Sequence, residues 1–300
     1  MKKIFLLILV YLMISPVFAQ DSLLNTLENE TEGQTINYTQ NTFKGTRLIN
    51  GHTVETRTAG SLVFLITHRF GELNSGSYNL WGLDVANIRF GFDYAITDAF
   101  TIGVGRSSFD KVFDGFLKYR LTRQCSGARN FPFTTTLFAS TALTTMKSLT
   151  GATIPFNHRL DYVAQALIAR KITDALSIQL MPSYIHHNYV ESADQVNDIL
   201  AVGVGGRIKV SNRIALTGEY YYRLNGTNVS GYYNSLSFGV DIETGGHVFQ
   251  IMLTNSNPMI AKGFISETTG SWADGGVHLG FNISRIFYLK QYQPEASDWQ

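Results

Sequence analysis

Cysteine and proline are scarce in this 300-residue chain, and each scarcity excludes a class of protein. The single cysteine, Cys125, cannot form an internal disulfide, and it rules out a zinc site built from several cysteines. Only 6 prolines stand beside 27 glycines, and aromatic residues make up 13% of the chain. This composition favours long, twisted strands over a loop-rich secreted domain.

Strong net charge and long apolar runs are also missing. The formal net charge is +1, so no strong field attracts nucleic acid, and no nucleic-acid partner is expected. After residue 20 there is no run of about 18 apolar residues, so no transmembrane helix is predicted in the mature chain.

Residues 1–19 have the pattern of a secretory signal peptide. Lys2 and Lys3 form a charged start, an unbroken apolar run follows over Ile4–Ile14, and Val17-Phe18-Ala19 fits a cleavage site. An uncleaved membrane anchor is the alternative, but the run is short for a span and no basic flank follows it. We therefore expect cleavage near Ala19 and export of the mature chain.

From about residue 60 onward, apolar residues alternate with polar or small ones in stretches of about ten residues. In the clearest stretch, residues 87–94, the apolar side chains fall on one face because successive side chains of a strand point to opposite faces. About twelve strands of membrane-crossing length are predicted in this way. They are Gly60–His68, Val85–Ile96, Ala99–Arg106, Phe113–Leu121, Phe133–Leu143, Arg159–Arg170, Leu176–His187, Asp198–Val210, Arg213–Leu224, Asn234–Ile242, Gly246–Thr254 and Val277–Phe287.

The connections between these strands are sorted by length. The short ones are Thr97-Asp98, Lys171–Ala175, Ser211-Asn212 and Glu243–Gly245, with a middling one at Thr122–Pro132. The others are mostly longer: Arg69–Asp84, Thr144–His158, Asn188–Asn197, Asn225–Tyr233 and Asn255–Gly276, with Ser107–Val112 brief. Short turns alternating with long loops are typical of an outer-membrane barrel, and a soluble β-sandwich gives no reason for such sorting.

The two faces of the predicted strands differ in charge. No Asp, Glu, Lys or Arg interrupts the mid-strand apolar positions, as a lipid-facing surface requires, since a Lys or Arg at the midplane costs about 2–4 kcal/mol. The opposite face is polar. Its candidate lumen-facing residues are Arg89, Asp93, Lys118, Arg120, Arg207, Glu219 and Asp241.

The chain therefore divides into a signal peptide (1–19), a polar N-terminal segment expected on the periplasmic side (20–59), a barrel (60–288) and a C-terminal tail (289–300). Within the polar segment, Ile36–Thr58 alternates too weakly for a lipid-facing strand, and Asn50-Gly51 signals a tight turn. We expect it to dock at the periplasmic mouth or in the lumen as a hairpin or plug, unless it is a disordered leader. Docking would bring Lys44 and Arg47 to inward carboxylates such as Asp93, Glu219 or Asp241.

Catalytic, metal-binding and cofactor motifs are weak. The nearest candidate for a nucleophile and base is His186-His187-Asn188 with Ser192. An Asp/His set on the rim would be drawn from Asp110, Asp114, His158 or His187, and no spacing supports it. Adjacent histidines of a strand point to opposite faces, so His186 and His187 cannot jointly chelate one metal without a bulge. The runs Gly103–Ser108 and Gly203–Gly206 match no phosphate-loop pattern and indicate relief of crowding on the inner face. We predict no cofactor and no enzyme activity.

Several stretches resemble a Bacteroidota family of exported β-barrel proteins titled domain of unknown function 5777. They are Thr42–His52, His68–Gly71, Trp81–Asp84, Gly103–Ser108 and Asp114–Arg120. The resemblance extends over nearly the whole mature chain. It implies an outer-membrane barrel without an assigned activity and without known catalytic residues.

The prediction is thus an antiparallel transmembrane β-barrel of about 12 strands in the outer membrane, with both termini in the periplasm. Its polar inner face favours a pore for small polar solutes. The alternatives are a closed adaptor barrel that binds a partner through exposed Tyr78, Trp81, Tyr232 and Trp272, and a barrel enzyme that acts on lipid. The expected partners are outer-membrane lipid, the barrel-assembly machinery, and a small solute or periplasmic protein.

Overall fold

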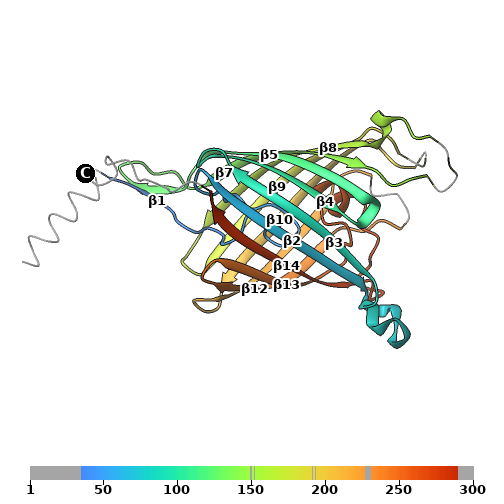
Figure 1. The fold of residues 1–300 in the computed structure, drawn as a ribbon. Coiled ribbons are helices and arrows are strands. Elements are labelled where there is room, and N and C mark those ends of the chain that lie inside the picture. The colour runs from blue at the N-terminus through green and yellow to red at the C-terminus, as the bar shows by residue number, and fades with distance from the viewer. Residues whose placement is uncertain are drawn as a thin grey trace, which may run out of the picture. The chain divides into compact units, whose positions relative to one another are not determined.

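The computed structural model describes residues 35–148, 151, 153–190, 192, 194–226 and 231–289. Twelve antiparallel strands close into a barrel (Figure 1). Each strand pairs with its neighbours in sequence, and β14 closes the barrel against β2. The strands are β2 (Ser61–Glu72), β3 (Ala86–Ala95), β4 (Phe100–Ser107), β5 (Val112–Thr122), β7 (Thr134–Thr144), β8 (Leu160–Lys171), β9 (Leu176–His187), β10 (Asp198–Lys209), β11 (Ile214–Arg223), β12 (Leu236–Thr244), β13 (His247–Thr254) and β14 (His278–Tyr288).

Every predicted strand has its counterpart in the barrel, so the predicted fold class is confirmed. The bounds of β9 are those expected, whereas β2 runs four residues beyond the predicted His68. The extension exists because Arg69 and Phe70 continue the pairing of β2 with Asn87 and Ala86 of β3.

The chain enters and leaves the barrel at the same end. Ser61 at the start of β2 pairs with Tyr288 at the end of β14, and the Leu289 amide donates to the Gly60 carbonyl over 3.0 Å. The short connections also lie at this end, which we call the turn end. The other end, the loop end, carries the long connections and the short helices η1 (Leu73–Ser75), η2 (Ser77–Gly82), η3 (Phe109–Lys111), η4 (Phe156–Arg159) and α3 (Ala261–Ser266).

Burial alternates along each barrel strand as the predicted faces require. Leu117 is 53% exposed and the next residue, Lys118, only 2%. Val204 and Ile251 are likewise exposed on the outer surface, while their sequence neighbours Gly205 and Gln250 are buried. The outer wall is therefore an apolar band and the inner wall is polar, the reverse of a soluble protein and the arrangement that lipid demands. None of the helices within the described part of the chain has the length and hydropathy to cross a membrane.

A second, small unit contains β1 (Ile36–Tyr38) and β6 (Cys125–Gly127), which form a two-stranded antiparallel sheet. The sequence suggested that Ile36–Thr58 folds as one segment. The structure divides it, because Ile36–Tyr38 form β1 of this small sheet and residues from Gln40 onward belong to the larger unit. The predictions for the signal peptide, for residues 20–34 and for the tail beyond residue 289 lie outside the described residues.

Candidate functional site

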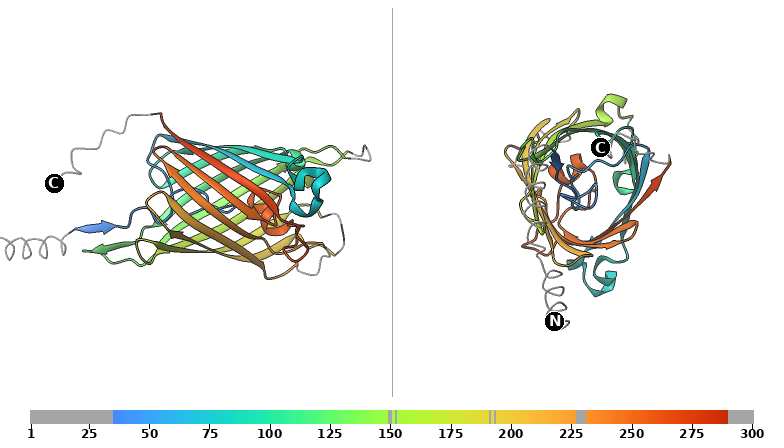
Figure 2. Two further views of the ribbon diagram at one scale, coloured as in Figure 1. Left: turned by 90° about the horizontal axis from the view of Figure 1, so that it is seen from below. Right: turned by 90° about the vertical axis from the view of Figure 1, so that its left-hand side faces the viewer.

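Residues 40–58, which we call the luminal segment, lie inside the ring of barrel strands (Figure 2). The segment folds back on itself around Asn50-Gly51: Arg47 and His52 form a β-bridge, and the Leu48 amide donates to the Gly51 carbonyl over 2.8 Å. The turn at Asn50-Gly51 is the one that the sequence predicts. Nearly all of residues 42–54 are buried, with Thr53 at 0% exposure.

The predicted lumen-facing residues converge on this segment. The Arg47 guanidinium forms an ion pair with Asp93 over 3.0 Å. The Glu219 carboxylate accepts hydrogen bonds from the amides of Asn50 and Gly51 over 2.7 and 3.1 Å, and Lys118 donates to the Glu55 carbonyl over 2.5 Å.

The remaining predicted positions bond mainly to one another or to other wall residues. Arg89 donates to Asp114 over 2.8 Å, and Arg207 pairs with Glu243 over 2.5 Å. Asp241 accepts from Gln250 over 2.9 Å, with Arg207 Nε 4.0 Å away. Arg120 is only partly buried, near the turn end, whereas the other six predicted positions are buried. The wall thus carries charges of both signs, and strand alternation alone brought them to one surface.

Lys44 meets an inward carboxylate as expected, but not one of the three that the sequence named. Lys44 binds Glu243 over 3.0 Å and makes no ion pair with Asp93, Glu219 or Asp241. Glu243 lies two residues beyond Asp241, on the same strand and nearer the turn end, where the Lys44 side chain remains 43% exposed. The more buried Asp241 is already bound by Gln250. A charged amine keeps more of its hydration at the outer position.

Apolar contacts also hold the luminal segment, and glycines of the wall make room for them. Gly205 faces inward, and a Cβ atom there would overlap the Leu48 side chain. At Gly239 an added Cβ would lie 3.5 Å from Ile49. Gly103 gives space to the ring of Phe116 in the same way. The two glycine-rich runs therefore relieve crowding, as their sequence predicts.

His52 is a buried imidazole in this segment. Its ring lies 4.7 Å from the Phe116 ring and 4.2 Å from the Phe138 ring, centroid to centroid. Burial, followed by the positive charges of Arg47 and Lys118, lowers the pKa of His52 well below its usual 6.5. Its Nδ1 atom has no hydrogen-bond partner among the described residues. The docked segment therefore disfavours protonation at this position.

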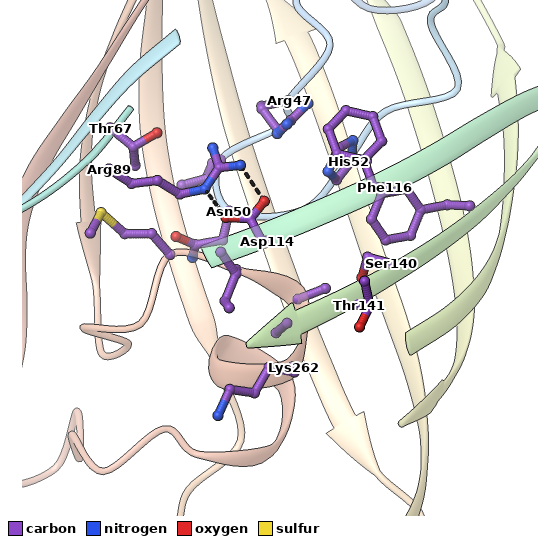
Figure 3. A pocket seen from close by; sticks show the side chains of 16 residues that line it. Arg47, Asn50, His52, Thr67, Arg89, Asp114, Phe116, Ser140, Thr141 and Lys262 are labelled. Carbon is purple, nitrogen blue, oxygen red and sulfur yellow. Dashed lines mark hydrogen bonds and ion pairs between the residues drawn. The ribbon is translucent and has the colours of Figure 1, made fainter. Parts of the chain in front are cut away.

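The loop between β13 and β14 enters the lumen from the other end. All six residues of α3 are buried, and the Phe264 ring packs 5.1 Å from that of Tyr221. Between α3 and the luminal segment remains a cavity of about 20 Å³, beside the Arg89–Asp114 pair (Figure 3). That is room for about one water molecule. The luminal segment and α3 therefore face each other across this small cavity inside the barrel.

Beyond α3 the loop end opens into a vestibule of about 580 Å³. Four of its lining side chains are linked: His187 Nδ1 lies 2.8 Å from Asp161 Oδ1, His187 Nε2 lies 3.0 Å from Ser266 Oγ, and Lys262 Nζ lies 3.2 Å from Asp161 Oδ2. Although burial lowers it, the pKa of Lys262 is raised overall by Glu267 and Asp161. The sequence carried no signal for this cluster, because Ser266 is 79 residues from His187.

The residues that the sequence offered as catalytic or docking candidates have other contacts in the structure. His186 points outward and bonds to Asp198 over 2.7 Å, whereas His187 points inward, so the two faces are as predicted. Asn188 donates to the Asn157 carbonyl, Asp114 pairs with Arg89, and His158 stacks on Tyr189, so these residues form no catalytic set. Of the four aromatic residues expected on the surface, Tyr78 and Trp81 are exposed, but Tyr232 and Trp272 are partly buried. In the described part of the chain, no three His, Cys, Asp or Glu side chains gather as metal ligands.

A closed barrel of twelve strands with an apolar outer band and a polar inner wall defines a membrane-spanning β-barrel of the outer-membrane class. The chain belongs to the family described as "Membrane bound beta barrel domain (DUF5777)", whose model matches residues 43–287. The matched residues include most of the luminal segment as well as the barrel.

Among solved structures, similar folds are found in outer-membrane proteins. The NanC porin is 8% identical at a TM-score of 0.47, over 76% of this chain and 98% of that one. The KdgM porin is 9% identical at a TM-score of 0.45, over 76% and 99%. An outer membrane channel from Pseudomonas putida F1 is 15% identical at a TM-score of 0.41, over 78% and 98%. Among curated protein sequences, none matches the chain.

Proposed function

We propose that this protein is an outer-membrane pore for small polar solutes whose passage is closed by its own luminal segment. The observation that carries the proposal is the chemistry of the contact: the segment meets a wall of charged and hydrogen-bonding side chains. The two clearest contacts are Arg47 with Asp93, and the Asn50 and Gly51 amides with Glu219.

A polar wall supports a pore because water can replace each of these contacts. A net hydrogen bond contributes only about 0.5–1.5 kcal/mol when water competes for both partners. A barrel that is closed for structural reasons alone gains more from an apolar filling, since buried ion pairs are often no better than apolar side chains of similar volume. The wall therefore fits a lumen that holds water once the segment leaves. Charges of both signs along it suit small polar solutes.

The direction of gating follows from the topology. The luminal segment enters from the turn end, where the strands are joined by short turns. Short turns face the periplasm in outer-membrane barrels, so the segment is reached from the periplasmic side and the vestibule opens outward. Insertion by the barrel-assembly machinery and control by a periplasmic partner would agree with this orientation.

Planar-bilayer recording tests the proposal. The full mature chain should give little or no conductance, and a chain with residues 40–58 deleted should give discrete steps. The matched control keeps all 19 residues of the luminal segment and changes only the exposed Thr58 to Ser. This control chain should remain closed.

A closed adaptor barrel is the second candidate, and one observation favours it. Phe43, Leu48 and Val54 of the luminal segment join an apolar cluster with wall residues such as Leu167 and Met181. This cluster would hold the segment permanently if its docking free energy were large. The full chain would then stay closed under all conditions although the deletion chain conducts. A deletion chain that folds, migrates as a heat-modifiable barrel and conducts no ions would exclude the pore.

A further inference from the structure

We infer that Asp161, His187 and Ser266 form a hydrolytic triad that opens to the vestibule and cleaves small carboxylic esters. The inference is independent of the pore: it concerns the loop end and requires no opening of the luminal segment. It rests on the geometry of three side chains from three separate elements, β8, β9 and α3.

The distances and the order of contacts are those of a nucleophile, a base and a group that orients the base. Asp161 Oδ1 lies 2.8 Å from His187 Nδ1, and His187 Nε2 lies 3.0 Å from Ser266 Oγ. A carboxylate at Nδ1 fixes the proton on that nitrogen and leaves the Nε2 lone pair toward the serine. Both distances fall within the range of about 2.6–3.2 Å expected for such a set.

Backbone pairing makes this arrangement rigid. Asp161 and His187 are directly opposite each other in the β8–β9 ladder, so both side chains project into the barrel from one register position. Ser266 ends the buried helix α3, which Lys262 fastens to Asp161 of β8 over 3.2 Å. Sites built on strands and fixed helices hold their geometry better than sites on loops.

The site is sheltered yet accessible from one side. Asp161, His187 and Ser266 are each at most 7% exposed, and all three line the vestibule of about 580 Å³. Pockets for small molecules usually measure about 300–1,000 Å³. Lys262 Nζ binds Oδ2 of Asp161 over 3.2 Å and so helps to hold the carboxylate that orients His187.

The reaction balances with water as the co-reactant. The Ser266 hydroxyl has two acceptors, the Lys262 main-chain oxygen and His187 Nε2, and rotation about its Cβ–Oγ bond directs the proton to the imidazole. Ser266 Oγ bonds to the ester carbonyl carbon while His187 takes that proton. The ester C–O bond then breaks, and the proton passes to the departing alkoxide. Water, deprotonated by His187, releases the acid and restores the serine.

Labelling with a tagged fluorophosphonate tests the inference on the folded barrel in detergent. The probe should modify Ser266, as peptide mass spectrometry would show, and Ser266→Ala should abolish labelling. His187→Gln should slow labelling at least tenfold. Its control is the adjacent His186→Gln, because His186 faces outward and should leave the rate unchanged. Hydrolysis of p-nitrophenyl acetate should follow the same order.

Further variants distinguish a catalytic role of the three residues from a purely structural role in holding α3 in place. Asp161→Asn should lower the hydrolysis rate at least tenfold and Asp161→Glu should restore part of it, while both migrate as folded barrels. In a Cys125→Ser background, Ser266→Cys should react with iodoacetamide faster with His187 present than with His187→Gln. A folded wild-type chain that is not labelled at Ser266, or a thiol whose alkylation ignores His187, would overturn the triad.

Discussion

A single methyl group at Gly205 should open the lumen. A Cβ atom at this position overlaps the end of the Leu48 side chain, whereas its other close neighbours, the Gly218 carbonyl and the Met181 methyl, stand at 3.2 and 3.4 Å. Gly205 lies in a strand that is paired on both sides, whereas Leu48 belongs to the luminal segment, so Gly205→Ala should displace Leu48 from its site. Overpacking of this kind costs about 1–3 kcal/mol. The population of the undocked segment should therefore rise about 5- to 150-fold.

The assay is the open probability of single barrels in a planar bilayer. Gly205→Ala should conduct far more often than the wild type at the same step size, since the barrel itself is unchanged. Gly115→Ala is the matched control, because Gly115 faces outward. Apart from the two residues next to it in sequence, the nearest group to an added Cβ is the Gly103 carbonyl, at 3.9 Å.

A double-mutant cycle makes the reasoning refutable. Leu48→Ala removes the group that Gly205→Ala displaces, so adding Gly205→Ala to Leu48→Ala should change the open probability little. Additive effects of the two substitutions would show that they act at separate places. Equal open probabilities for Gly205→Ala, Gly115→Ala and the wild type would refute the idea that Leu48 holds the segment closed.

Three further predictions concern the same barrel. Asp93→Asn should weaken docking of the luminal segment by about 3–5 kcal/mol, because it leaves the buried Arg47 without its carboxylate. Adding Arg47→Met should recover part of this loss, and the rate of proteolysis between Thr42 and Arg57 in the folded barrel measures both effects. Equal cleavage of the wild type, the single variant and the double variant would contradict the role of the ion pair. Acid should also open the lumen: the docked state lowers the pKa of His52, so its stabilisation is full above about pH 6.5 and falls by about 1.4 kcal/mol per pH unit below it. Open probability that rises on acidification in the wild type and equally in His52→Phe would assign the effect to another group. Val204→Arg, on the exposed outer face at the middle of β10, should destabilise the barrel by about 2–4 kcal/mol in urea unfolding from bilayers, while Val204→Leu should change it little.

Strand alternation is a local property, and the parts of the structure that depend on it were predictable. Residues 87–94 show in one stretch which side chains face lipid and which face the lumen, and β3 has that arrangement. Lumen-facing charges such as Asp93 and Lys118 follow from the same two-residue period. The Asn50-Gly51 turn was predictable because its signal lies in two adjacent residues.

Contacts across the lumen were not predictable from local patterns. The depth at which the luminal segment stops decides whether Lys44 meets Asp241 or Glu243, and nothing in residues 40–58 alone specifies that depth. The helix α3 was missed because it is six residues long and lies in a connection without periodicity. Its packing on Tyr221, and with it the contact of Ser266 with His187, results from the barrel as a whole.

The luminal segment joins β2 through only Ala59 and Gly60, and this short tether sets how the barrel would close. A released segment cannot diffuse away, so rebinding is intramolecular, with an effective concentration on the order of millimolar for a short flexible link. An intrinsic affinity of about 1 mM, or roughly 4 kcal/mol, would already keep the lumen closed half of the time. Weak and replaceable contacts are then sufficient for closure, and a modest pull on the chain that precedes residue 40 would be sufficient for opening.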